Sequence, residues 1–119
     1  MDIKLLNGNT VRLVLARYRR KVGGRSKSKF QHSVGDQLAV DYPHDNIYEE
    51  VFIPGERFFL DFFIPSISLV VECHGKQHVE HIRHFHKTKT EFHRQLDTDQ
   101  RKRDWCTLNG FRFLEIYDE

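Results

Sequence analysis

The sequence predicts a single domain of the mixed α/β class. Short apolar segments bounded by turn residues predict strands, two longer segments with helical spacing predict helices, and the two kinds of element alternate along the chain. A length of 119 residues suits one hydrophobic core and is too short for two. After an N-terminal hairpin, the predicted order is helix, three strands, long helix and strand.

The first part of the chain predicts a hairpin, a flexible break and a helix. Two short strands lie within residues 3–15 around the turn sequence Asn7-Gly8-Asn9. Residues 22–26, VGGRS, form the break. The helix spans residues 28–41 and stops before Pro43, because the residue preceding a proline disfavours the helical conformation.

The rest of the chain predicts three strands, a loop, a helix and a last strand. The three strands are residues 47–53, 57–63 and 67–74, separated by Pro54-Gly55 and Pro65-Ser66. A histidine-rich loop follows over residues 75–85, then a long helix over residues 88–108 and the strand FRFLEIY over residues 111–117. Asn109-Gly110 is a sequence typical of a helix C-terminus.

Composition excludes several classes of protein. At 39% apolar and 30% charged, the chain is ordinary for a folded globular domain, and no apolar run reaches the length of a membrane span. The first ten residues lack the basic-then-apolar pattern of a signal peptide, so we expect a cytoplasmic protein with no membrane contact. Cys73 and Cys106 are too few for a disulfide framework and are expected to be buried, reduced thiols.

Basic residues gather in two regions although the net charge is only +2. Such stripes favour contact with phosphates over a uniformly solvated surface, although solvent-facing helix charges are the alternative. The first region contains Arg17, Arg19, Arg20, Lys21, Arg25, Lys27 and Lys29, and the second contains Lys87, Lys89, Arg94, Arg101, Lys102 and Arg103.

Two acids lie inside apolar strands, where a carboxylate is costly to bury unless it is paired or binds a metal. A hairpin centred on Ser66 and Ile67 places Asp61 opposite Glu72, with about 5 Å between the Cβ atoms. Carboxylates this close repel each other and raise one pKa unless a cation lies between them. The pair therefore predicts a site for a hard cation; the alternative is exposed strand ends paired with Lys or Arg.

The histidines and one further acid are the other candidate site residues. Six of the eight histidines fall between His74 and His93, but without a zinc signature, so structural zinc is a minor alternative. Strand alternation places His74 beside Glu72, where it could act as a general base. Asp99 lies on the apolar face of the long helix, which predicts either an ion pair or a supporting contact to the site.

At these residues the sequence resembles a nuclease family. Asp61 followed after twelve residues by His74-Gly75 resembles the very-short-patch repair endonucleases, in which one strand ends at Asp and the next at His-Gly. Residues 96–116 resemble the closing helix and strand of those enzymes, with Thr98 in place of the Arg before Asp99.

A second group of relatives is similar through the pattern Asp, then Glu-x-Asp-Gly-x-x-His. Asp61, Glu72, Gly75 and His78 match this pattern, with His74 in place of the second Asp. Both groups belong to the PD-(D/E)XK nuclease superfamily, and the resemblance covers about residues 29–116.

The resemblance implies a restriction-endonuclease-like fold, which is a mixed β-sheet flanked by helices. Residues 1–27 would form a hairpin and basic arm, and residues 28–119 the nuclease core. The implied function is Mg²⁺- or Mn²⁺-dependent hydrolysis of DNA phosphodiester bonds. A homodimer is an assembly that such a small nuclease domain could form. Asp61, Glu72 and the carbonyl of Cys73 would hold the metal.

The departures from the family pattern leave some roles open. His74 stands where the family usually has a lysine, two residues after the Glu. The resemblance therefore implies His74 as the general base, with His78 or Lys76 assisting it or taking its place. The acid that many members place on the first helix has candidates in Asp36, Gln37, Glu49 and Glu50. DNA would contact Arg17, Arg19, Arg20, Lys102 and Arg103. A non-catalytic nucleic-acid-binding module on the same fold is the alternative function.

Overall fold

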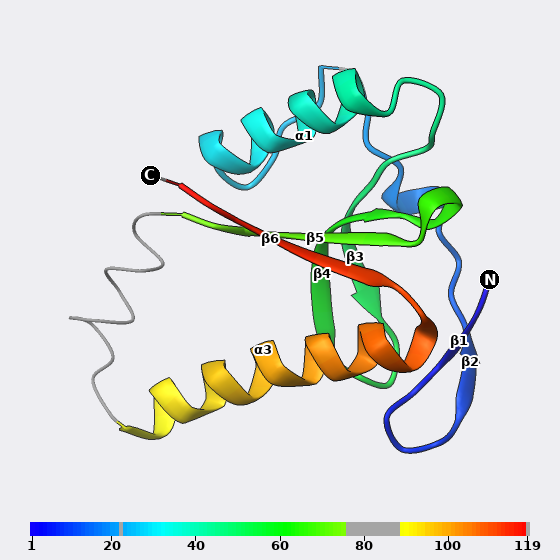
Figure 1. Ribbon diagram of the computed structural model, residues 1–119, viewed down its shortest axis with the longest axis vertical. Helices are drawn as coiled ribbons and strands as arrows, with labels where there is room; N and C mark the ends of the chain where they lie inside the picture. The colour runs from blue at the N-terminus through cyan, green and yellow to red at the C-terminus, as the bar shows by residue number, and fades with distance from the viewer. Residues whose placement is uncertain (22, 76–88, 119) are drawn as a thin grey trace.

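The computed structural model describes residues 1–21, 23–75 and 89–118, which form a sheet with one long helix on each face (Figure 1). The sheet has four strands in the order β3-β4-β5-β6, and a separate two-stranded hairpin, β1-β2, lies beside it. The strands are β1 (Asp2–Lys4), β2 (Thr10–Arg12), β3 (Tyr48–Ile53), β4 (Phe58–Ile64), β5 (Leu69–His74) and β6 (Arg112–Tyr117). The helices are η1 (Ala16–Tyr18), α1 (Lys29–Asp41), η2 (Pro65–Ile67) and α3 (Lys89–Asn109). The mixed α/β class is confirmed, as is the order of the predicted helices and strands within the described residues. The predicted histidine-rich loop over residues 75–85 lies, apart from Gly75, outside the described residues.

Local signals in the sequence account for the ends of α1 and α3. The Ser28 side chain caps α1 by accepting a hydrogen bond from the backbone N–H of Gln31 at 3.0 Å. The helix ends at Asp41, with Tyr42 as its C-cap immediately before Pro43, as predicted. Gly110 ends α3 with a φ of 73°, a left-handed conformation that favours glycine.

The strand pairings fix where the candidate residues lie. β3, β4 and β5 form an antiparallel meander, whereas β6 runs parallel to β5 and is reached through α3. In the β4–β5 pair, Phe62 lies opposite Val71 and Ile64 opposite Leu69. This register centres the connection on Ser66 and Ile67, which confirms the predicted hairpin register. The third predicted strand starts later than expected, at Leu69, because residues 65–67 form the short helix η2.

Two apolar clusters lie on opposite faces of the sheet. On the α3 face, Trp105 and Cys106 pack against Leu60 and Val70 in a cluster that also includes the β1-β2 hairpin. The α1-face cluster contains Val34 and Leu38 with Phe62, Ile64, Leu69 and Val71. Because both faces are covered, β5 is mostly apolar from Leu69 to Cys73, with Glu72 as the one acid in that stretch and His74 at its end. None of the helices in the described part of the chain is both long and apolar enough to cross a membrane.

Candidate functional site

The two acids predicted to form a site are both buried and adjacent. Asp61 is 6% exposed and Glu72 is 5% exposed. The Asp61 backbone N–H donates to Glu72 Oε2 at 2.7 Å, and the Cys73 backbone N–H donates to Asp61 Oδ2 at 2.8 Å. Each carboxylate therefore accepts a hydrogen bond from the backbone of the other strand, which explains how these acids are tolerated among apolar residues.

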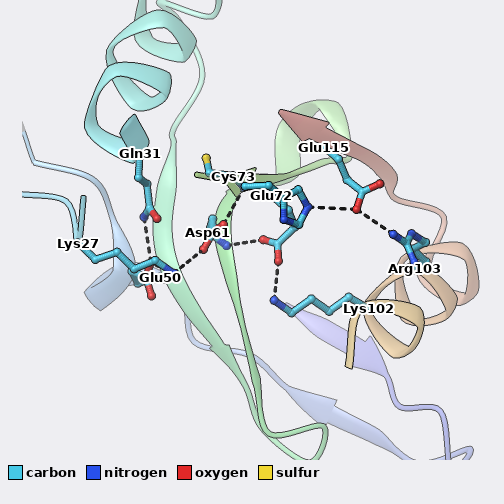
Figure 2. A network of polar contacts seen from close by, with 10 residues as sticks. Lys27, Gln31, Glu50, Asp61, Glu72, Cys73, Lys102, Arg103 and Glu115 are labelled. Atoms are coloured by element: carbon cyan, nitrogen blue, oxygen red, sulfur yellow. Dashed lines mark hydrogen bonds and ion pairs between the residues drawn. The ribbon is translucent and has the colours of Figure 1, made fainter. Parts of the chain in front are cut away.

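The two carboxylates take lysine partners from opposite sides of the sheet, although alternation predicts a shared face for the two acids. Asp61 Oδ1 lies 3.2 Å from Lys27 Nζ, and Glu72 Oε1 lies 2.5 Å from Lys102 Nζ on α3. Figure 2 shows the two lysines approaching from opposite sides. The cause is an interruption of alternation at Asp61: Leu60 packs in the α3-face cluster and Phe62 in the α1-face cluster.

Both acids therefore carry a lysine partner while remaining buried. The sequence left open the alternative that both acids lie at exposed strand ends and pair with Lys or Arg. The acids are in fact buried, so the expected exposure is wrong, whereas the expected pairing with lysine is correct. Burial raises the pKa of Glu72 to about 7, and the charge of Asp61 acts in the same direction against the opposing charge of Lys102. For Lys27, burial lowers the pKa, but the charges of Asp61 and Glu50 outweigh it and raise the pKa above 10.5.

A polar network extends from Asp61 to the first helix through residues that the sequence patterns did not single out. Lys27 also lies 3.6 Å from Glu50 Oε1, and Gln31 Nε2 donates to Glu49 at 2.8 Å and Glu50 at 2.9 Å (Figure 2). Gln31 is fully buried, and its Oε1 atom has no hydrogen-bond partner among the residues that the structure describes. The helical spacing of Gln31 with Val34 and Leu38 was the available signal, since it places a polar side chain on the sheet-facing side of α1.

Four residues were candidates for the acid that many members of the nuclease superfamily place on the first helix. Some of them belong to this network and the others lie at the surface. Asp36 is bound to Arg20 at 2.8 Å and its side chain is exposed, so it lies at the surface and connects to the network through Arg20, which also contacts Glu49. Gln37 bonds to Asp41 on the surface of α1. Glu49 and Glu50 do belong to the network, and the helix contributes Gln31 instead of an acid.

His74 is held by partners from β6 at the end of β5. Its Nε2 atom lies 3.2 Å from Glu115 Oε1, and its ring stacks on Tyr117 with 4.8 Å between centroids. Arg103 donates to the same Glu115 oxygen at 2.9 Å. The parallel β5–β6 register, which sets His74 opposite Tyr117, is what brings these groups together.

The basic residues predicted to contact DNA fall into two groups. Arg17 and Arg19 are exposed beside a hollow of about 440 Å³, whose lining includes Lys21, Arg25 and Lys27. By contrast, Arg20 is 13% exposed and its guanidinium contacts both Asp36 and Glu49. Arg20 therefore joins the basic segment to α1 and β3, a structural position that its sequence neighbours do not reveal.

The two predicted DNA contacts on α3 also have carboxylate partners. Lys102 is 15% exposed and paired with Glu72, while Arg103 is 42% exposed and paired with Glu115. The structure thus places Lys102 within the candidate site. Asp99 is half-buried on α3, one turn before Lys102, with its supporting role still a prediction. Lys76 and His78 lie outside the described residues.

Cys106 is buried, as predicted, whereas Cys73 is half-buried. Both are free, and burial raises the pKa of Cys73 and of Cys106 to about 12, with the nearby carboxylates adding to the effect. A thiol with such a pKa is a poor nucleophile and a poor metal ligand at neutral pH.

Among residues 1–21, 23–75 and 89–118, no group of three or more His, Cys, Asp and Glu side chains converges on one point that could hold a metal ion. Two carboxylates remain as candidate ligands, Asp61 and Glu72, with the unpartnered Gln31 Oε1 nearby in the same network.

Comparison with known proteins gives two partial matches to viral proteins. The chain is 39% identical over 57 residues to uncharacterized protein 307L of Invertebrate iridescent virus 6, and 38% identical over 64 residues to uncharacterized protein 033L of Invertebrate iridescent virus 3. These matches cover 48% and 54% of this chain, but only 29% and 33% of the two viral proteins. No family model and no solved structure matches.

Proposed function

We propose that this domain is a Mg²⁺-dependent endonuclease of restriction-endonuclease type that hydrolyses DNA phosphodiester bonds. The observation that carries the proposal is the buried, adjacent pair Asp61 and Glu72, in which each carboxylate accepts a hydrogen bond from a backbone N–H of the other strand. The resemblance of residues 58–78 to very-short-patch repair endonucleases rests on the same two strands.

The residues present fit a hard cation such as Mg²⁺. This ion commonly uses only one or two protein carboxylates and completes its octahedron with water and substrate phosphate oxygens, so a cluster of three side chains is not required. Burial, and after it the charge of Asp61, raise the pKa of Glu72 in spite of its lysine neighbour, and a bound cation would offset both effects. Asp61, Glu72 and the Cys73 carbonyl would hold the ion, which would polarise the phosphate and acidify a bound water.

The protein's own side chains would supply positioning and proton transfer. Lys27 and Lys102 would hold non-bridging phosphate oxygens, since each ammonium already lies beside one of the carboxylates that the phosphate would approach. His74, oriented by Glu115, would accept the proton of the attacking water. Lys76 and His78 remain proposed helpers. A single centre cuts one strand, so cutting a duplex through both strands would need a second copy or a partner.

A non-catalytic nucleic-acid-binding module is the second candidate function. The two lysine pairs favour it, because Lys27 and Lys102 already neutralise the acids and could make them purely structural. Both functions predict DNA binding, and they differ in whether the bound DNA is cut.

A cleavage screen with isosteric substitutions tests the proposal. Asp61→Asn and Glu72→Gln should each lower the rate of DNA cleavage in Mg²⁺ or Mn²⁺ by at least about 100-fold, because the metal supplies several kcal/mol of charge stabilisation to the transition state. The substrates are duplex, mismatched, branched and single-stranded DNA of the same length. Asp97→Asn, an exposed acid on α3, is the matched control and should cut like the parent.

The outcomes separate the two functions. Cleavage by the parent and the control but not by the two variants supports the nuclease. Binding without cleavage by any of the four proteins supports the binding module. Cleavage at the parent rate by either variant removes the assignment of Asp61 and Glu72.

A further inference from the structure

An exposed pair of phenylalanines lies on the same strands as the candidate site. Phe52 of β3 and Phe59 of β4 are cross-strand partners whose rings lie 5.1 Å apart at 57°. Phe59 is 49% exposed and Phe52 is half-buried. Neither residue belongs to the two apolar clusters, so the packing of the core does not account for them.

The pair faces the same side as the acidic network. Phe58 and Leu60, the neighbours of Phe59 in β4, pack in the α3-face cluster, so Phe59 points the other way. On that side α1 covers only the far part of β4, at Phe62 and Ile64. Figure 1 shows the β3-β4 hairpin extending away from α1.

The spacing connects the aromatic pair to the site. Phe59 precedes Asp61 by two residues and Phe52 follows Glu50 by two residues, which at about 3.3 Å per residue is about 6.6 Å along each strand. Stacked nucleotides advance about 3.4 Å each, so the pair would lie about two nucleotides from a phosphate at Asp61. The basic hollow adjoins Asp61 as well, because its lining includes Lys27 and Glu50, and Lys27 is the ion-pair partner of Asp61.

We propose that Phe52 and Phe59 form a stacking platform for unpaired bases next to the scissile phosphate, so that the preferred substrate is a single-stranded segment of DNA. This inference rests on the proposed function for the position of the phosphate. A base inside a duplex has both faces covered by its neighbours, whereas an unpaired base has a free face that a phenylalanine can stack on. The basic hollow would hold the phosphates of the same strand.

The competing explanation is that the two rings only stabilise the hairpin as a cross-strand aromatic pair. The test must therefore measure binding, not stability. Affinity for a labelled single-stranded oligothymidine and for a duplex of equal length is measured at one salt concentration, without divalent metal, for Phe59→Ala, Phe59→Leu and Phe59→Tyr. Leu108→Ala, an equally exposed apolar residue at the end of α3, is the control.

We expect Phe59→Ala to bind the single strand about 10- to 100-fold more weakly, as loss of one base–aromatic stack predicts, with duplex affinity unchanged. Phe59→Leu keeps the bulk without the aromatic face and should lose a similar factor, whereas Phe59→Tyr and Leu108→Ala should bind like the parent. Equal binding of the single strand by Phe59→Ala and the parent overturns the proposal, as does an equal loss for both substrates. This assay measures binding and not cleavage, so its outcome is independent of the nuclease proposal. The stacking platform can be supported in a protein that cuts no DNA, and it can be refuted in a protein that does.

Discussion

At the scale of single residues, the chemistry of the candidate site depends most on Glu72. This carboxyl is buried beside a second carboxylate and one ammonium, and its pKa is about 7 in the folded chain against an ordinary 4.5. A raised pKa means that the folded protein binds the proton more tightly than the unfolded chain does. The stabilisation that the protonated carboxyl provides is complete below pH 4.5 and is lost as the pH rises through about 7.

Glu72→Gln should remove this dependence, because the amide does not titrate. We expect the free energy of unfolding of the variant, relative to the parent, to rise between pH 4.5 and 7 and then level off. The gain is on the order of 1 kcal/mol per pKa unit. The unpaired Lys102 in the variant adds a destabilisation that does not vary over this range. Urea unfolding at several pH values measures the difference, with Asp97→Asn as control, and a constant difference from pH 4.5 to 7 would contradict the assignment.

At the scale of elements, α1 positions one side of the site through its N-terminus. Ser28 caps the helix at the backbone N–H of Gln31, the same residue whose amide bonds to Glu49 and Glu50. Ser28→Ala should lower the free energy of unfolding by about 1 kcal/mol, the usual cost of losing such a cap.

Ser33→Ala is the matched control for the cap, since Ser33 is an exposed serine inside the same helix. Its hydroxyl donates to the carbonyl of Lys29, four residues earlier in the same helix, so the substitution should change stability by less than about 0.5 kcal/mol. Equal losses in the two variants, measured by chemical denaturation, would show that the cap contributes nothing of its own.

The elements themselves could be predicted from sequence, because each has a local signal. Ser28 and Pro43 delimit α1, Gly110 ends α3, and Pro65-Ser66 marks the β4–β5 turn. The directions of the site side chains could not. The alternation of β4 breaks at Asp61, between Leu60 and Phe62, and Glu50 on the neighbouring strand has a positive φ of 53°; neither feature has a sequence signature.

Partners distant in sequence are the other feature that patterns do not reveal. Lys27 and Lys102 are separated by 75 positions, yet they approach the same pair of acids from the two helical sides of the sheet (Figure 2). In the sequence both belong to basic regions that predict phosphate contacts. Tertiary packing, and not local composition, decides which basic residues face the site and which face solvent.

At the scale of the whole molecule, charge separates into a basic hollow and a nearly neutral remainder. The net charge of +2 conceals this, because Arg20, Lys102 and Arg103 are each paired with carboxylates. Arg17 and Arg19 are exposed at the hollow and have no carboxylate among their described ion-pair partners. These two residues should therefore supply phosphate contacts, while Arg20 should not.

Replacing Arg17 and Arg19 together by Gln should weaken duplex binding for all sequences alike. Each phosphate contact releases counterions, so the slope of log affinity against log salt should become shallower by about 0.9 per contact, or about 1.8 for the pair. A double variant at Arg12 and Arg112, both exposed and outside the lining of the hollow, removes the same charge and should leave the slope nearly unchanged. Titrations at several salt concentrations compare the two variants. Equal flattening in both would mean that DNA responds to total charge and not to this hollow, and an unchanged slope in the Arg17 and Arg19 variant would mean that the hollow does not contact the phosphate backbone.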